Sequence, residues 1–204
     1  MELQKMKGIV LRELPFGEAD KLLIVLSDTN GRISVSAKGA KKPGSRFLAA
    51  AQPFAYSEME LGRGKSMYIL RNAELLDPFF NLRNDLDTLT AASGITRLTA
   101  RIVQEELPDP DTLRLLLKAL SLLDKGGRNP QLIASIFSVR LLKIQGMISA
   151  LSDLDLQGKD NLMPGTKAAF SHVCTAPDEK LFAFSVSDTV NAEFANLAEA
   201  LTRR

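Results

Sequence analysis

Residues 28–38 read Asp-Thr-Asn-Gly-Arg-Ile-Ser-Val-Ser-Ala-Lys, which is a turn followed by a short alternating segment. The Asn30-Gly31 pair favours a tight hairpin turn because both residue types readily adopt a positive φ. After the turn, Ile33, Val35 and Ala37 alternate with polar or charged residues, as in a strand with one buried face. We therefore expect a half-buried β-strand here, preceded by a turn.

Other short strand segments surround this one. They lie at residues 7–14 and 21–27, joined by a turn-rich connection, and at residues 54–61 and 66–76, which flank Gly62-Arg63-Gly64. Five short strands with small turns match a closed Greek-key barrel of the OB type. An SH3-like barrel has a similar number of strands, so the spacing alone does not separate the two. We expect the barrel to occupy residues 1–79.

Helical patterning follows the barrel. After Asp77-Pro78 the period of the apolar residues changes from 2 to 3.6, which predicts a helical domain over residues 80–204. Its first helix is expected at about residues 83–104. The predicted fold class is therefore α+β, a β-barrel followed by an α-helical domain.

Capping signals place the remaining helices. A capping residue precedes proline at Asp109-Pro110 and at Asn129-Pro130, and Ser187 can cap a final helix. Residues 148–187 form a weakly patterned insertion, with a strand expected at residues 181–186. Short connections between the helices predict antiparallel neighbours.

The composition is that of a globular protein, with 45% hydrophobic and 25% charged residues. No apolar run approaches the roughly 20 residues of a membrane-spanning helix, and the N-terminus lacks the apolar core of a secretory signal. The single cysteine, Cys174, cannot form an internal disulfide, which fits a reducing compartment. We expect a cytoplasmic protein with no membrane association.

Positive charge is concentrated in one part of the sequence. The whole chain has a formal net charge of only +2, but residues 32–72 contain eight basic and two acidic residues. A local cluster of this size attracts polyanions even when the whole molecule is nearly neutral. The basic stretch therefore predicts a nucleic-acid interface.

The candidate nucleic-acid-binding residues lie on two connections of the expected barrel. A barrel can bring such connections together at one rim, where cations neutralise phosphates and aromatic rings stack on bases. Among the aromatic residues, Phe16, Phe47, Tyr56 and Tyr68 are interleaved with the basic ones, although most are expected in the core. A merely solvated loop is the alternative. The candidates are Lys38, Lys41, Lys42 and Arg46 on the first connection and Arg63 and Lys65 on the second.

Catalytic groups are scarce. The single histidine, His172, and Cys174 cannot complete a zinc site by themselves, and Gly62–Ser66 lacks the first glycine of a phosphate-binding loop. The carboxylates Glu18 and Asp20 are expected to form the turn and to pair with Lys21. We predict no catalytic residues, no metal and no cofactor.

Arg140 is an anomaly within the predicted helices because it lies on the apolar face of its helix. It is expected either to snorkel out or pair with a carboxylate, or to bind the carboxylate of an acidic, apolar peptide end. Lys143, on the same helix, is a second candidate for partner binding.

An ordered set of segments resembles RecO, the bacterial recombination mediator family. The segments are Lys7-Gly-Ile-Val-Leu-Arg12, Phe16-Gly-Glu-Ala-Asp-Lys21-Leu-Leu, Gly31-Arg-Ile-Ser34, Ala37-Lys-Gly-Ala-Lys-Lys-Pro43, Gln52-Pro-Phe54, Ala73-Glu-Leu-Leu-Asp-Pro-Phe79 and Phe137-Ser-Val-Arg-Leu-Leu142. The resemblance covers most of residues 7–147 and implies, by analogy, that the barrel is of the OB type. After Gly146 the chain departs from the four-cysteine zinc module of many relatives.

The resemblance implies a non-enzymatic DNA repair protein that binds single- and double-stranded DNA and anneals complementary strands. It implies cooperation with RecR, contact with the C-terminal tail of single-strand-binding protein through the helical domain, and help in loading RecA. The alternative is a protein-interaction adaptor of the recombination machinery with weak or lost DNA binding. A nuclease is the least favoured reading.

Overall fold

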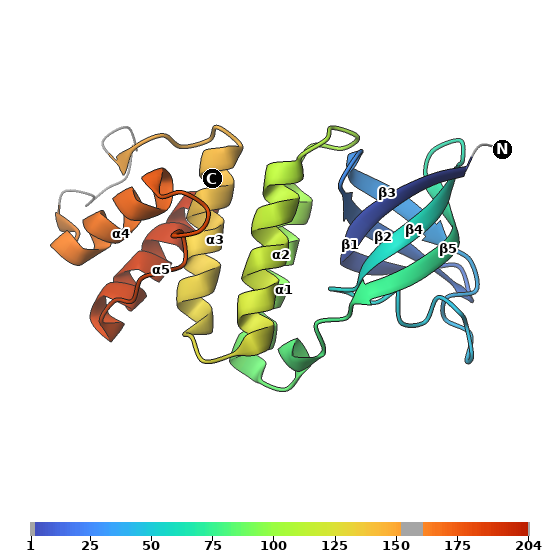
Figure 1. Cartoon of the computed structure of the whole chain (residues 1–204), viewed down its shortest axis with the longest axis horizontal. Helices are drawn as coiled ribbons and strands as arrows, with labels where there is room; N and C mark the ends of the chain where they lie inside the picture. Colours follow the sequence, from blue (N-terminus) through green and yellow to red (C-terminus); the bar gives the residue numbers. More distant parts are fainter. Residues whose placement is uncertain (1–2, 152–160, 204) are drawn as a thin grey trace. The chain divides into compact units, whose positions relative to one another are not determined.

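The computed structural model describes residues 3–151 and 161–203 (Figure 1). Two compact units make up the chain: Met1–Phe80 with Thr99–Arg114, and Asn81–Leu98 with Leu115–Arg204. Residues 99–114 thus belong to the unit of the barrel, although they lie in the helical half of the sequence.

The strands form a closed barrel in the order β1-β2-β3-β5-β4. Every neighbouring pair is antiparallel except β3 with β5, which is parallel and has the register pairs Val35–Tyr68 and Ser36–Ile69. The five-stranded OB-type barrel expected from the sequence is confirmed. The strands are β1 (Leu3–Phe16), β2 (Asp20–Ser27), β3 (Gly31–Ala37), β4 (Tyr56–Arg63) and β5 (Tyr68–Asp77).

The strand predicted from the alternating pattern after Asn30 is present as β3. Gly31 begins β3 with a φ of 60°, which is a left-handed conformation that glycine adopts without strain. Ile33, Val35 and Ala37 are at most 1% exposed and belong to the barrel core, whereas Arg32 and Ser34 are half-buried. The strand therefore contributes one face to the core and the other toward solvent.

β1 is longer than the sequence suggested, because it begins at Leu3 and not at Lys7. Its first three residues, Leu3, Gln4 and Lys5, are exposed, but the backbone pairs with β4 from Leu3–Gly62 to Ile9–Tyr56. Backbone pairing of this kind needs no buried side chain, so these exposed residues gave no alternating pattern that marks a strand.

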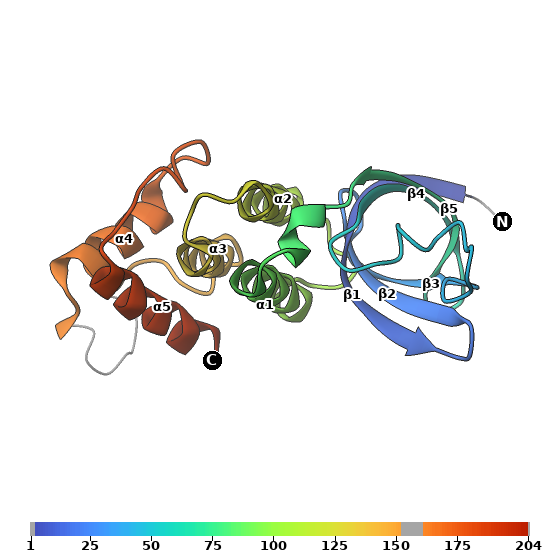
Figure 2. The same cartoon turned by 90° about the horizontal axis from the view of Figure 1, so that it is seen from below.

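The helices follow a short 3₁₀ turn at Phe80–Arg83. Figure 2 shows α1, α2 and α3 nearly end-on and next to one another. No helix among residues 3–151 and 161–203 has the length and apolar character needed to span a bilayer. The helices are α1 (Leu86–Ile102), α2 (Pro110–Lys125), α3 (Pro130–Ile144), α4 (Pro164–Thr175) and α5 (Asp188–Thr202).

The predicted capping residues are confirmed. The Asp109 side chain accepts a hydrogen bond from the Thr112 backbone nitrogen at 2.9 Å, and Asn129 accepts one from Leu132 at 3.2 Å. Ser187 accepts one from Val190 at 3.4 Å at the start of α5. These local bonds satisfy backbone donors that each helix leaves unpaired at its first turn.

Within the weakly patterned stretch, the structure contains α4. The strand expected at residues 181–186 is wrong, because no ladder partner pairs with it and all strands of the described ranges belong to the barrel. Leu181 and Phe182 are buried, and the Ala183 nitrogen closes a turn on the Lys180 carbonyl. Residues 152–160 of this stretch lie outside the described residues.

Candidate nucleic-acid interface

The connection between β3 and β4 carries most of the predicted cations, and we call its residues 38–46 the basic loop. In Figure 2 this connection passes across the ring of strands. Ala40, Phe47 and Ala51 from the connection are buried in the barrel core. The apolar residues thus anchor the connection, and the charged ones between them stay outside.

Hydrogen bonds attach the basic loop to the turn between β1 and β2. The Gly39 nitrogen donates to Asp20 Oδ1 at 2.7 Å, and the Lys41 nitrogen donates to the Ala19 carbonyl at 2.9 Å. Lys41 Nζ also donates to the Gly17 carbonyl at 2.9 Å. Asp20 therefore holds this loop, and the expected pairing of Asp20 with Lys21 is wrong: Lys21 pairs with Glu13.

The four cations of the basic loop, Lys38, Lys41, Lys42 and Arg46, are all exposed. Arg46 donates to the Arg71 carbonyl on β5 at 2.6 Å, and its guanidinium carbon lies 4.7 Å from the centre of the Phe47 ring. Since Phe47 is only 6% exposed, the ring supports Arg46 and is not open for stacking on a base. The loop presents a fixed cluster of positive charge.

The second predicted group lies on the turn between β4 and β5. Arg63 and Lys65 are exposed, and the Gly64 nitrogen closes the turn on the Met67 carbonyl at 3.0 Å. Arg63 binds both carboxylate oxygens of Glu106, at 2.5 and 3.2 Å. Its guanidinium carbon lies 4.6 Å from the centre of the Tyr68 ring.

The basic loop and the β4–β5 turn lie against different parts of β1. The end of β4 pairs with the start of β1 through Leu3–Gly62. The basic loop instead contacts the turn at the other end of β1, after the Phe16–Asp20 pair. Arg46 of the basic loop approaches the second group more closely, because it donates to Arg71 on β5 and Tyr68 of the same strand pairs with Arg63. The expectation of one shared rim stays a prediction.

The aromatic candidates divide into buried and accessible rings. Phe47 and Tyr68 are core residues, at 6% and 3% exposure, as expected for most of this set. Tyr56 is half-buried, and burial together with the nearby Asp28 raises the pKa of its phenol. Phe16 is 42% exposed and precedes Gly17, which accepts the hydrogen bond from Lys41. Phe16 is therefore the candidate best placed for stacking beside the basic loop.

Arg140 forms hydrogen bonds and an ion pair within the helical unit. Its guanidinium donates to the Val173 carbonyl at 3.1 Å and to Asp178 Oδ1 at 2.9 Å, and the side chain is only 15% exposed. The carbonyls at the end of α4 lack partners within their own helix, so Arg140 satisfies one of them. Lys143, the other candidate, is half-buried on α3.

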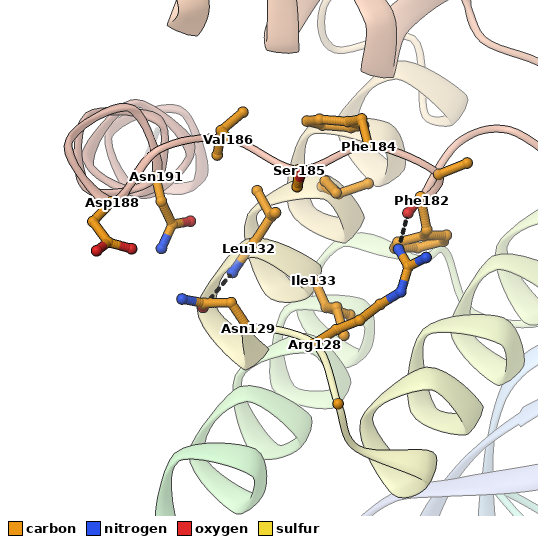
Figure 3. A pocket seen from close by; sticks show the side chains of 13 residues that line it. Arg128, Asn129, Leu132, Ile133, Phe182, Phe184, Ser185, Val186, Asp188 and Asn191 are labelled. Atoms are coloured by element: carbon orange, nitrogen blue, oxygen red, sulfur yellow. Dashed lines mark hydrogen bonds between the residues drawn. The ribbon is translucent and has the colours of Figure 1, made fainter.

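A pocket of about 440 Å³ in the helical unit was not foreseen (Figure 3). Its walls come from the start of α3 and from the segment before α5, which are far apart in the sequence. Leu132, Ile133 and Phe184 supply apolar surface, and Arg128 donates to the Phe182 carbonyl at the edge. The capping motif at Asn129 predicted the start of α3, which forms one wall of the pocket. No local pattern predicted that the segment before α5 would form the other wall.

His172 and Cys174 both have structural surroundings. The His172 ring packs edge-on against Phe184 at a centroid distance of 4.8 Å, and Nε2 lies 3.1 Å from the Lys180 carbonyl. Cys174 is buried in α4, and burial raises the pKa of its thiol against the opposing charges of Lys143 and Arg140. In the part of the chain that the structure describes, no three His, Cys, Asp or Glu side chains cluster as metal ligands do.

We expect Cys174 to react slowly with a disulfide reagent such as dithionitrobenzoate in the native protein at neutral pH. The residue is only 9% exposed and its thiol is mostly protonated, whereas the thiolate is the reactive form. Stopped-flow absorbance should give a rate about 100-fold below that of the urea-unfolded chain. Equal rates in the two states would show that α4 opens freely.

Two protein-family models match this chain. The family described as recombination protein O N terminal matches residues 1–79, and recombination protein O C terminal matches residues 83–154. Together they cover the barrel strands and the helices α1 to α3.

Several curated relatives carry the name DNA repair protein RecO. The chain is similar to one from Acetivibrio thermocellus, with 29% identity over 98% of this chain and 90% of the relative. A relative from Desulforamulus reducens is 37% identical over 84% of this chain and 65% of its own length. The Bacillus subtilis relative is 32% identical over 74% of this chain and 58% of its own. The chain thus spans less than two thirds of the length of the latter two.

Proposed function

Because the chain belongs to the RecO family of DNA repair proteins, we propose that it is a recombination mediator that binds single- and double-stranded DNA. In this role it promotes annealing of complementary strands and helps to load recombinase onto DNA coated by single-strand-binding protein. The proposed partners are RecR, the C-terminal tail of single-strand-binding protein and, indirectly, RecA, and the proposed location is the cytoplasm.

One observation supports DNA binding above the others. The exposed cations of the basic loop are held on a closed barrel by buried apolar neighbours and by bonds to the β1–β2 turn. A fixed loop loses little conformational freedom on binding, so the charges are arranged before DNA arrives. Contacts to phosphates from such a loop carry no sequence preference, which suits a protein that acts on any DNA strand.

Phe16 adds an apolar contact to this proposal. Its ring is exposed next to the loop, and a base can stack on it while Lys41 and Lys42 neutralise the neighbouring phosphates. Arg63 and Lys65, on the turn between β4 and β5, are a second part of the proposed interface.

Replacing Lys41, Lys42 and Arg46 together with alanine should weaken binding of a fluorescein-labelled oligothymidylate about tenfold or more at low salt. If the wild type meets four to six phosphates, its log affinity should fall against log salt with a slope of about −3 to −4. The variant should flatten this slope by about 2, since three contacts are lost. Fluorescence anisotropy over a salt series measures both quantities.

The control removes the same charge elsewhere. Lys5 and Lys7 on β1 and Lys125 at the end of α2 are exposed, and their triple alanine variant should keep the wild-type slope. An unchanged slope in the basic-loop variant, or an equal loss in the control, would contradict the assignment of the interface.

The pocket in the helical unit favours a second candidate function, that of an adaptor. It combines apolar walls with Arg128, which are the features that receive an apolar peptide carrying a carboxylate. An adaptor would hold a tail peptide of single-strand-binding protein in both the wild type and the basic-loop variant while neither binds DNA. Under this reading Arg140 and Lys143 remain proposed partner-binding residues.

A further inference from the structure

Residues 103–107, which we call the acidic segment, lie against the start of β3. The Glu106 nitrogen donates to the Arg32 carbonyl at 3.0 Å, and Glu105 forms a parallel bridge with Arg32. The approach at Gly31 is so close that a Cβ atom there would lie 1.8 Å from the Leu107 carbonyl oxygen. The segment is therefore seated on β3 through its backbone.

The acidic segment occupies an edge of β3 that β5 leaves open. β2 pairs with β3 along one edge from Gly31 to Ala37, whereas β5 pairs with the other edge only at Val35 and Ser36. The acidic segment takes the remaining part of that second edge, at Arg32. The acidic segment therefore pairs with the part of β3 that β5 does not reach.

The side chains of the acidic segment bind two cations of the barrel. Glu106 receives two hydrogen bonds from Arg63, and Glu105 accepts one from Ser34 at 3.3 Å. Arg32 Nη2 lies 3.8 Å from Glu105 Oε2, and Arg32 Nε donates to the Val103 carbonyl at 2.9 Å. Two carboxylates on successive residues thus meet two guanidinium groups.

This arrangement has the chemistry of a nucleic-acid backbone. A guanidinium binds two oxygens of a carboxylate in the same forked geometry with which it binds two oxygens of a phosphate. The guanidinium of Arg63 lies over the ring of Tyr68, and Asn30 Nδ2 donates a hydrogen bond to the Tyr68 hydroxyl at 2.9 Å. Arg63 is therefore presented as a fixed fork, whichever anion it binds.

We infer that Arg32 and Arg63 form a second phosphate-binding site for a nucleic-acid strand, and that the acidic segment occupies it until the strand displaces it. The inference rests on the proposed nucleic-acid binding and deepens it, since it adds an internal competitor. Neither Arg32 nor the carboxylates of Glu105 and Glu106 were predicted as functional from the sequence.

Several features make displacement feasible. The Arg63 and Glu106 side chains are 51% and 49% exposed, and ion pairs in contact with solvent are weak. Glu106 also has a φ of 57°, a left-handed conformation that is strained for a glutamate. Hydrogen bonds from Arg63 lower the pKa of the Glu106 carboxyl, so the carboxylate keeps its charge at neutral pH. A polyanion that releases counterions can replace such a contact.

The test compares oligothymidylate binding by the wild type and by the Glu105→Gln/Glu106→Gln variant. Removing both carboxylate charges should raise affinity about three- to tenfold at low salt, because the strand no longer competes with them. The slope against log salt should steepen by about 1.4, the value for two added phosphate contacts on a single strand. Fluorescence anisotropy gives both readings.

Two further variants isolate the cause. Glu58→Gln/Glu74→Gln removes the same charge from two residues that face each other on β4 and β5, and should change affinity less than twofold. Adding Arg32→Ala/Arg63→Ala to the glutamine variant should abolish the gain. If the glutamine variant behaves like the Glu58/Glu74 control, or keeps its gain without the two arginines, the inference is wrong.

The same experiment separates this inference from the proposed function. If the wild type binds oligothymidylate and the glutamine variant binds it with the same affinity, the inference is wrong and the proposed function stands. Binding by the glutamine variant but not by the wild type supports a fully occluded site. If neither binds oligothymidylate up to about 100 μM, the weak end of non-specific binding, both proposals fail. Tighter binding of a polyglutamate peptide than of oligothymidylate would mean a protein ligand and would also overturn the inference.

Discussion

Replacing Phe137 with alanine is expected to lower the free energy of unfolding of the helical unit by about 3–5 kcal/mol. Phe137 is 0% exposed and lies in the middle of α3, the helix that packs against both α4 and α5. The truncation removes a large buried ring and leaves a cavity that rigid neighbouring helices cannot fill. Urea unfolding followed by circular dichroism measures the loss.

A matched control uses an apolar residue that is exposed. Leu86, the first residue of α1, is 76% exposed, so its alanine variant should unfold within about 0.5 kcal/mol of the wild type. A loss below about 1 kcal/mol for Phe137→Ala would show that α3 is not the centre of the helical core.

The second large effect is expected at Gly31. An alanine at a φ of 60° is strained by about 1 kcal/mol, and its Cβ would also overlap the Leu107 carbonyl oxygen at 1.8 Å. Since backbone cannot rotate away as a flexible side chain can, the acidic segment must leave its place beside Arg32. We expect a total loss of about 3 kcal/mol, measured as the unfolding of the barrel unit.

Gly17 provides the control for this substitution. It has nearly the same conformation, with a φ of 64°, but no atom lies within 4 Å of the Cβ that alanine would add. Gly17→Ala should therefore show the backbone strain alone, about 1 kcal/mol. Equal losses at the two positions would mean that the acidic segment yields at no cost.

Features that depend on neighbours in the sequence were predictable. The capping residues Asp109, Asn129 and Ser187 make bonds within three residues, so the residue types identify them. The alternation in β3 likewise reports burial residue by residue. The family resemblance then selected the OB barrel, where strand spacing alone had left two barrels open.

Features that depend on long-range packing were not predictable. Arg63 and Glu106 are 43 residues apart, and nothing near either residue indicates that the other is its partner. Arg140 was recognised as unusual, but its partners come from the end of α4, whose position no local pattern gives. The basic loop illustrates the same limit, because nothing near Arg46 indicates that it binds the Arg71 carbonyl, 25 residues away.

The parallel pair of β3 with β5 has a consequence for how the barrel forms. The β1–β2, β2–β3 and β4–β5 pairs join strands that are neighbours along the chain, so they can assemble as local hairpins. The β3–β5 pair has only two register positions and must close the long connection that contains the basic loop. Closing a long loop costs entropy before the contacts that it allows can form. We therefore expect the β3–β5 pair to form late in folding and to open early in local unfolding of the barrel. Arg46 binds the Arg71 carbonyl on β5, so this cation takes up its final position only when β5 is in place.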